Sequence, residues 1–373
     1  MENELKDRKF EFKNEGYTPF LNKIDVYQDG TVPMDRDKDG SLYAISGHSH
    51  MGHIGMFKGK TLDDLKEVYP IKTNFQVGHK DEAFSNIKYP EGVDARGSIW
   101  VFGLYIAKKT NRFFAFFHNE TGWNGKGSAY DAFGQCEKPH FDSDFRHIGL
   151  MHSDDEGGTW DFDRWIISSE SVCFSEKYIP GGINVIGQKF GEISLGSGDF
   201  SIYINYKDGF IYLFYNILKF DMKSNLLKAC DTYLARTRIR DDGVMGDFVK
   251  YYNGGFTEAG NFGKESVIIP NSWHSKVVYS NYLKSYILTY TKVKTDVVIT
   301  EGGIEDIVQI RTSKDLINWS EPIDLMKDGK KLGNHYNSFV SSNTSMPSEI
   351  DDEFYFLTCN NGTDVEKMKI KIK

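Results

Sequence analysis

Short runs of aromatic and β-branched residues recur along the 373-residue chain, and turn-forming residues bound them. Examples are Ser41–Ser46, Phe113–His118, Phe210–Tyr215, Tyr286–Thr291 and Phe354–Cys359. Runs of this length, bounded by Gly, Asp or Asn, are typical of β-strands. Strands therefore outnumber helices in the predicted fold, and no alternation of strands with helices indicates a parallel sheet.

Two of these runs follow an Asp-Gly pair. Asp39-Gly40 precedes the strand in DKDGSLYAI, and Asp208-Gly209 precedes the strand in YKDGFIYLF. Gly accepts a positive φ without steric cost, so both pairs predict hairpin turns. Only Thr61–Glu67 and the end of the chain have a pattern compatible with a helix.

The composition agrees with an all-β fold and excludes several other classes. Phe, Tyr and Trp make up 14% of the residues, and there are 36 Gly but only 9 Pro. This composition excludes a disordered chain, collagen, a coiled coil and a helix bundle. The formal net charge is -8, and no basic stripe is present, so we expect no nucleic-acid partner.

The sequence shows no membrane span, no signal peptide and no cysteine motif. No segment approaches the roughly 18 apolar residues of a membrane span, so no membrane partner is expected. Met1–Tyr17 is charged and lacks the apolar core of a signal peptide, but a secreted protein expressed without its signal would look the same. The four cysteines lack CxxC spacing, so buried free thiols are expected: Cys136, Cys173, Cys230 and Cys359.

A weak internal repeat predicts a β-propeller. SDDEGGTW at Ser153–Trp160 fits the Asp-box pattern S-x-D-x-G-x-x-W, and RTSKDLINW at Arg311–Trp319 carries a looser form. A third echo, Ala235–Tyr251, has Phe248 in place of the tryptophan. In such hairpins the Asp accepts turn amides and the aromatic ring packs between blades.

The spacing of the echoes sets the expected number of blades. It corresponds to one or two blades of roughly 60–80 residues each, which predicts about five four-stranded antiparallel blades. We therefore expect a single all-β domain, a five-bladed β-propeller over residues 1–373, in which residues 1–25 form an N-terminal extension or a closing strand.

Three carboxylates are candidate catalytic groups. Asp35 follows an apolar stretch, where the inner strand of a blade would begin; DRDKDG around it resembles an EF-hand loop, but Ser46 stands where that loop needs Glu, so a polar turn is expected. Glu120 ends the aromatic strand of FFAFFHNETGW, where burial would suit a general acid, unless it is a surface residue. Asp199 opens a strand in GSGDFSIY and could instead cap a turn.

Histidines and aromatic residues near these acids are candidate substrate-binding groups. SGHSHMGHIG has histidines at metal-like spacings, but no further ligand is evident, so we predict no metal site and a hydrogen-bonding inner strand instead. In a propeller, one polar cluster from each blade converges on the axis. The candidates are His48, His50, His118, Trp123, Glu258, His274 and His335.

Motifs of several other enzyme classes are missing. The sequence has no GxSxG elbow, P-loop, HExxH helix or dinucleotide fingerprint. A sialidase, which also carries Asp boxes, would show three arginines for the substrate carboxylate and an R-I-P motif. The region of the first blade has Arg36 but no R-I-P.

With these residues, the sequence resembles the five-bladed β-propeller glycoside hydrolases that include families 32, 43, 62 and 117. LARTRIRDDGVMGDFVKYYNGGFTEAG looks like the W-x-K-Y-Y-N-G-x-F-S-E-P-G segment of bacterial glycosidase-like propeller proteins. HNE followed by FRHIGLMHSDDEGGTW looks like their H-x-E and S-I-G-L-A-x-S-x-D-G-G-x-T-W segments. The likeness extends from about Val32 to about Asp324.

The resemblance implies an enzyme that hydrolyses O-glycosyl bonds of a poly- or oligosaccharide, with furanoside-type substrates as one expected class. It implies that Asp35 is the base, Glu120 the proton donor and Asp199 the pKa-tuning or orienting acid. Related enzymes carry Asp in the second blade and Glu in the third, so the roles of Glu120 and Asp199 stay open. No organic cofactor is expected, and a structural Ca²⁺ or other ion on the propeller axis is compatible with the resemblance.

Two alternatives remain. The same histidines and aromatic residues would serve a non-catalytic carbohydrate-binding propeller, and a sialidase would bring three arginines together. Convergence of Asp35, Glu120 and Asp199 in one funnel is the feature that the hydrolase interpretation requires.

Overall fold

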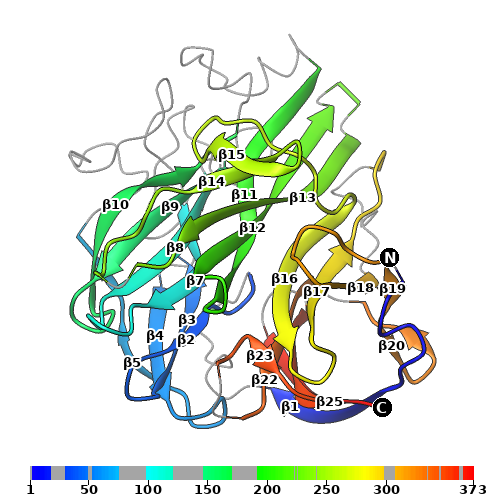
Figure 1. Ribbon diagram of the computed structural model, residues 1–373, viewed down its shortest axis with the longest axis horizontal. Helices are drawn as coiled ribbons and strands as arrows, with labels where there is room; N and C mark the ends of the chain where they lie inside the picture. Colours follow the sequence, from blue (N-terminus) through cyan, green and yellow to red (C-terminus); the bar gives the residue numbers. More distant parts are fainter. Residues whose placement is uncertain are drawn as a thin grey trace.

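The structure is a computed structural model. Its described part contains β-strands and no helix (Figure 1). The described residues are 2–17, 30–48, 53–74, 98–120, 146–169, 191–221, 223–224, 226–240, 242–297, 307–333, 335–343, 346–360 and 364–373.

The strands form successive groups with antiparallel pairing inside each group. The first three groups are joined in one 14-stranded sheet, through β3 with β7 and β11 with β9. The first group is β2 (Met34–Arg36), β3 (Leu42–His48), β4 (His53–Gly59) and β5 (Lys66–Pro70). The second is β7 (Ser98–Ile106), β8 (Phe113–Glu120), β9 (Arg146–Ser153) and β10 (Thr159–Ile167). The third is β11 (Glu192–Asn205), β12 (Phe210–Asp221), β13 (Leu226–Arg238) and β14 (Val249–Tyr252), extended by β15 (Gly255–Ala259).

Two further groups follow in the described chain. The fourth is β16 (Ser272–Ser280), β17 (Ser285–Lys292), β18 (Ile307–Ser313) and β19 (Ile323–Asp324). The fifth is β22 (His335–Ser341), β24 (Glu353–Asn360), β25 (Asp364–Ile372) and β1 (Phe10–Tyr17). Of the short strands, β6 (Lys72–Thr73) pairs in parallel with β10, and β23 (Glu349–Ile350) pairs in parallel with β16. The strands β20 (Met326–Lys327) and β21 (Lys330–Lys331) form a separate two-stranded sheet.

The two ends of the chain meet in the fifth group. β1 pairs antiparallel with β25, and Phe10 lies opposite Ile372. The N-terminal segment thus supplies the outer strand of a group whose other strands come from the end of the chain. This pairing joins the two termini through backbone hydrogen bonds.

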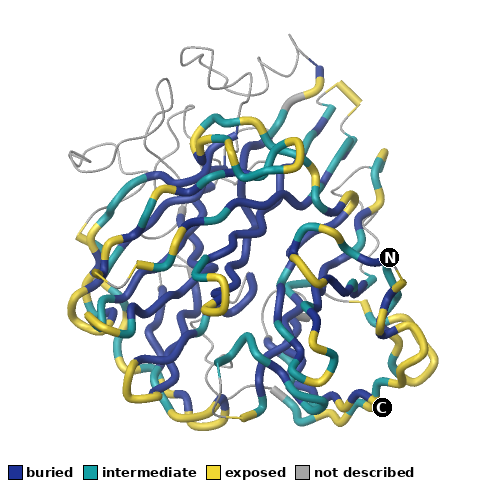
Figure 2. The backbone as a smooth tube through the Cα atoms, viewed as in Figure 1, coloured by how far each residue is buried: buried dark blue, intermediate teal, exposed yellow. Residues whose placement is uncertain are grey.

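Most strand interiors are buried, as the dark blue segments in Figure 2 show, and the buried apolar residues form clusters between neighbouring groups. Aromatic pairs bridge the first three interfaces: Tyr43 with Phe113 at 4.8 Å, Phe102 with Phe200 at 5.7 Å and Tyr203 with Tyr286 at 5.5 Å between ring centroids. The fourth and fifth groups share a cluster that includes Ile287 and Phe354. The fifth and first share another that includes Phe57 and Leu357. The arrangement therefore closes on itself.

The turns of the two repeat segments have a common arrangement. Asp155 Oδ1 accepts a hydrogen bond from Thr159 N at 2.8 Å, and Trp160, which follows, is fully buried. Asp315 Oδ1 accepts the turn amides of Ile317 and Asn318 in the same way. In both turns a carboxylate satisfies backbone donors that a tight turn leaves without partners.

Both helix expectations are wrong. Residues 61–64 form a turn in which Asp64 Oδ1 accepts Thr61 N at 2.6 Å, and β5 begins at Lys66. The end of the chain is β25, paired with β24 on one side and β1 on the other. Strand partners supplied by the tertiary structure outweigh local helix propensity in both segments.

Cysteine and membrane expectations are tested only in part. Cys230 is a buried free thiol, as expected; Cys136 and Cys173 lie outside the described residues. No helix in the described part of the chain has the length and apolarity to cross a membrane.

Truncation of Trp160 tests the packing between the first two groups. Trp160→Ala removes a fully buried ring, and we expect it to lower the free energy of unfolding by about 3–5 kcal/mol. Urea denaturation measures the loss, and the exposed Tyr282 provides a control, because Tyr282→Ala should change little. A cost below about 1 kcal/mol for Trp160→Ala would contradict this packing.

Candidate functional site

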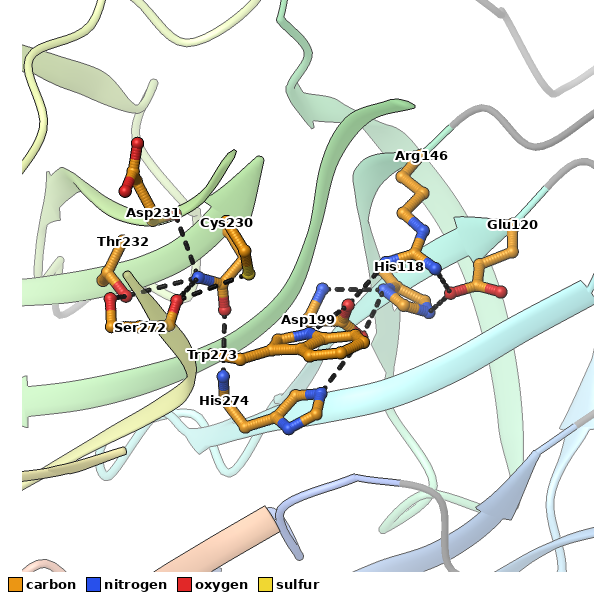
Figure 3. A network of polar contacts seen from close by, with 11 residues as sticks. His118, Glu120, Arg146, Asp199, Cys230, Asp231, Thr232, Ser272, Trp273 and His274 are labelled. Atoms are coloured by element: carbon orange, nitrogen blue, oxygen red, sulfur yellow. Dashed lines mark hydrogen bonds and ion pairs between the residues drawn. The ribbon is translucent and has the colours of Figure 1, made fainter. Parts of the chain in front are cut away.

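Arg146, the first residue of β9, connects two carboxylates (Figure 3). Its Nη2 lies 3.0 Å from Glu120 Oε1, and its Nη1 donates to Asp199 Oδ2 at 2.5 Å. The three side chains are between 3% and 7% exposed. Burying two carboxylates is costly unless they have charged partners, and one guanidinium serves both.

The strand pairing explains why these side chains meet. Glu120 ends β8 directly opposite Arg146 in the antiparallel ladder. β11 touches β9 where Gly196 pairs with Arg146. Gly196 has φ of +82°, and a Cβ there would lie 2.3 Å from Arg146 O; a Cβ on Gly198 would lie 2.9 Å from His118 Nδ1. The two glycines therefore let β11 approach closely enough for Asp199 to reach the guanidinium.

Three inner strands carry a bulge with a strained residue. Asp199 in β11, His274 in β16 and Tyr336 in β22 have φ of 41°, 56° and 54°. Each lies within a register shift of its strand. Bulges redirect side chains, and positive φ in a residue other than glycine is concentrated at functional sites. The result is that His274 Nε2 lies 4.0 Å from Asp199 Oδ1 and the His274 ring 4.0 Å from that of Tyr336.

His118 is held as a neutral ring with a defined tautomer. Its Nδ1 accepts a hydrogen bond from Asp199 N at 2.9 Å, so the ring proton is on Nε2. Nε2 lies 3.3 Å from Glu120 Oε1. Burial lowers the pKa of His118 to about 3, although Asp199 favours the charged form. A neutral N–H therefore faces the Glu120 carboxylate over the physiological pH range.

Asp199 is held in its ionised form. Trp273 Nε1 donates to its Oδ2 at 2.9 Å. Burial by itself would raise the pKa of Asp199, but Arg146, His274 and His118 outweigh burial and keep this pKa well below its usual range. We refer to His118, Glu120, Arg146, Asp199, Trp273 and His274 as the Arg146 cluster.

Rings from the fourth and fifth groups adjoin the Arg146 cluster. Trp273 stacks on His274 with a centroid distance of 4.6 Å, and the His335 ring lies 6.0 Å from Trp273. His335 and Tyr336 are half-buried, so part of this surface is accessible. Aromatic and imidazole rings beside charged groups suit a ring-shaped polar ligand, which needs both stacking and hydrogen bonds.

The structure thus brings together several residues predicted from the sequence. Glu120, Asp199, His118 and His274 belong to the Arg146 cluster, and His335 lies beside it. His50 and Trp123 lie outside the described residues, and of His48 only the backbone at the end of β3 is described.

Asp35 does not join the cluster, which corrects the expected convergence of three carboxylates. It is fully buried, accepts Ile106 N and Arg36 N at 2.7 Å each, and pairs with Lys108 at 3.3 Å. Ile106 is the last residue of the nine-residue β7, whereas Glu120 lies opposite the first, Ser98. Along a strand of that length, the backbone positions that Asp35 and Glu120 contact are roughly 25 Å apart. Burial raises the pKa of Asp35, and its role here is to hold the far end of β2 against β7.

Glu258, which the sequence predicts to bind substrate, is not part of the Arg146 cluster. It lies on β15, in the outer hairpin of the third group, and its Oε2 accepts Lys264 N at 3.2 Å. In the order of the sheet, β12, β13 and β14 separate β15 from β11, which carries Asp199.

His118, Glu120 and Asp199 could in principle hold a cation, since each offers one ligand atom within 4.8 Å of the others. Arg146, however, already binds both carboxylates. A metal ion would have to displace the guanidinium, or it would be repelled by the positive charge of that group at close range. These residues therefore fit the arginine better than a metal ion.

Sequence reasoning missed Arg146 and the hydrogen bond of Trp273. One signal for Arg146 was available in the sequence. It is a charged residue directly before the apolar run HIGLM, whose strand pairs with the strand that ends in HNE. Among the described residues, Arg146 is the one arginine in this cluster. A sialidase would bring three arginines together.

Comparisons with known proteins identify the fold. No family model and no curated protein matches the chain. Among solved structures, Zg3597, a family 117 glycoside hydrolase from the marine bacterium Zobellia galactanivorans, has a TM-score of 0.52 and 10% identity, over 99% of this chain and 92% of that one. A glycosyl hydrolase from Bacteroides ovatus has a TM-score of 0.48 and 11% identity, over 99% and 96%. The resemblance to propeller glycoside hydrolases is thus confirmed for the fold.

Gly196 and Gly209 form a matched pair that tests the close approach of β11. Both have positive φ, but a Cβ on Gly209 meets nothing within 4 Å. We expect Gly209→Ala to cost about 1–2 kcal/mol of unfolding free energy from φ strain alone. Gly196→Ala should cost clearly more, because its methyl group collides with Arg146 O. Equal costs in urea denaturation would show that β11 and β9 do not make this contact.

Asp35→Asn tests the structural role of Asp35. An amide nitrogen must replace one oxygen that now accepts a backbone N–H, so we expect a loss of about 1–3 kcal/mol in unfolding free energy. Ligand binding or activity per folded molecule should stay the same. Unchanged stability combined with abolished activity would instead return Asp35 to the functional site.

Proposed function

We propose that the protein is a five-bladed β-propeller glycoside hydrolase and that the Arg146 cluster is its active site. The observation that carries the proposal is the pair of buried carboxylates, Glu120 and Asp199, which one guanidinium bridges beside accessible rings. The closed succession of five strand groups and the fold shared with a family 117 hydrolase support the architecture. The substrate proposed is a poly- or oligosaccharide, with furanoside-type sugars to be tested first.

The environments of the two carboxylates support different roles. Asp199 is held ionised by Arg146 and Trp273, so it is suited to stabilise, or to attack, the positively charged anomeric carbon of the transition state. Glu120 is then the remaining carboxyl for the proton donor to the leaving oxygen. Arg146 and the N–H of His118 favour its ionised form in the free protein, so the substrate must displace these contacts before Glu120 takes up a proton. This assignment transfers to Asp199 the role that the sequence had given to Asp35.

The spacing of the two carboxylates supports a retaining reaction. One oxygen of Glu120 and one of Asp199 lie within 4.8 Å of each other. Inverting enzymes need about 6.5–9.5 Å between the carboxyl groups to accommodate water, whereas retaining enzymes have about 5–5.5 Å.

A second candidate function is non-catalytic carbohydrate binding. The observation that favours it is that Arg146 pairs with both carboxylates. Ionised carboxylates held in this way can accept hydrogen bonds from the hydroxyl groups of a bound sugar without any catalysis. Binding without turnover of any substrate would support this candidate over the hydrolase.

A panel of aryl-glycosides and polysaccharides, assayed with matched variants, tests the proposal. We expect Glu120→Gln and Asp199→Asn each to lower kcat by about 10²–10⁴-fold, the usual contribution of such a group. Glu258→Gln, on the outer hairpin, is the matched control and should retain full activity. Equal activity of wild type and Glu120→Gln would remove Glu120 from the mechanism. For any substrate that is cleaved, NMR of the first product should show retention of configuration.

A further inference from the structure

The inner strands also line a pocket that includes no residue of the Arg146 cluster. It contains about 420 Å³ of space between atoms, part of it open to solvent, and has room for only a few water-sized molecules. Its walls are mainly apolar and come from the inner strands of different groups. They include Met34, Phe102, Leu104, Ile202, Ile204 and Phe339.

One charged side chain, Lys276 of β16, lines this pocket. No described carboxylate lies within ion-pair distance of its Nζ, and burial lowers the pKa of Lys276 to about 8. The deeply buried lysines of the fold differ in this respect. Lys250 pairs with Glu265 and donates to Ser168 O at 2.8 Å, and Lys367 pairs with Asp63.

An ammonium group in an apolar pocket is stabilised by a negative partner, and without one its charged form is disfavoured and its pKa falls. The chain supplies no such partner to Lys276 in its described part, although its net charge is -8. The half-buried side chain leaves the pocket accessible to a small ion. The small volume excludes a sugar ring or a nucleotide, and the positive charge disfavours a metal cation.

We propose that Lys276 and the surrounding apolar walls form a binding site for a small monovalent anion of about the size of chloride. Apolar walls offer few hydrogen bonds to replace hydration, so weakly hydrated bromide and iodide should compete with chloride, and fluoride should not. Of the axial ions compatible with the resemblance, this pocket thus favours an anion over Ca²⁺.

The site has a defined pH dependence. The other residues that line the pocket, from β2, β7, β11, β22 and the segment before β23, are apolar, apart from Ser348, and none of them titrates. The anion binds to the protonated amine. Its affinity should therefore be constant below the pKa of Lys276 and fall about tenfold for each pH unit above it, until the pKa of the anion-bound form is reached.

Chloride NMR of the full chain in gluconate buffer tests the proposal, with Lys276→Met as the variant and Lys66→Met as its matched control on an exposed strand position. We expect wild type and Lys66→Met to broaden the chloride resonance below the pKa of Lys276, bromide to reverse the broadening, and Lys276→Met to show none. Absence of broadening in wild type, or equal broadening in Lys276→Met, would overturn the proposal.

Thermal unfolding gives a second readout that does not depend on NMR. Lys276→Met should fold at least as stably as wild type, because it removes a charge that has no partner. The unfolded chain binds the lysine proton more tightly than the folded one, so this group makes wild-type stability rise with pH from about 8 to about 10.5. Lys276→Met should lack this rise. Chloride should raise the Tm of wild type but not of Lys276→Met; the same increase in both would contradict the site.

Discussion

The ion pairs of Arg146 with Glu120 and Asp199 are the interaction on which the site depends. Two carboxylates are buried beside each other, and a single guanidinium compensates them. For this to occur, β11 must lie against β9 at Gly196, and the backbone must bend at Asp199. The tautomer of His118 follows from the same bend, because Asp199 N donates to its Nδ1.

The wider fold fixes the strands that carry these groups. Aromatic rings packed between neighbouring groups, and β1 paired with β25, hold the ring of strand groups closed. The strands then present two centres of opposite character, the Arg146 cluster on β8, β9, β11 and β16, and the pocket of Lys276. The Arg146 cluster has two carboxylates for one guanidinium, whereas Lys276 has an ammonium without a described counter-charge.

Local features were predictable from the sequence, and long-range ones were not. The strands, the Asp-Gly turns and the carboxylate of Asp155 depend on neighbouring residues, so composition and spacing predicted them. Glu120 and Asp199 were found singly, as acids at strand ends. Arg146 binds Asp199 across 53 residues of sequence, and no spacing rule predicts such a pair.

The wrong prediction for Asp35 has the same origin. Its position at the start of an inner strand was predictable, but the end of β7 that it contacts was not.

The most direct test is the structure of a complex with an oligosaccharide that the protein binds or cleaves. We expect the sugar to lie within hydrogen-bond distance of Glu120, beside the rings of Trp273 and Tyr336. A sugar bound elsewhere, with the Arg146 cluster unchanged and not in contact with it, would contradict the account.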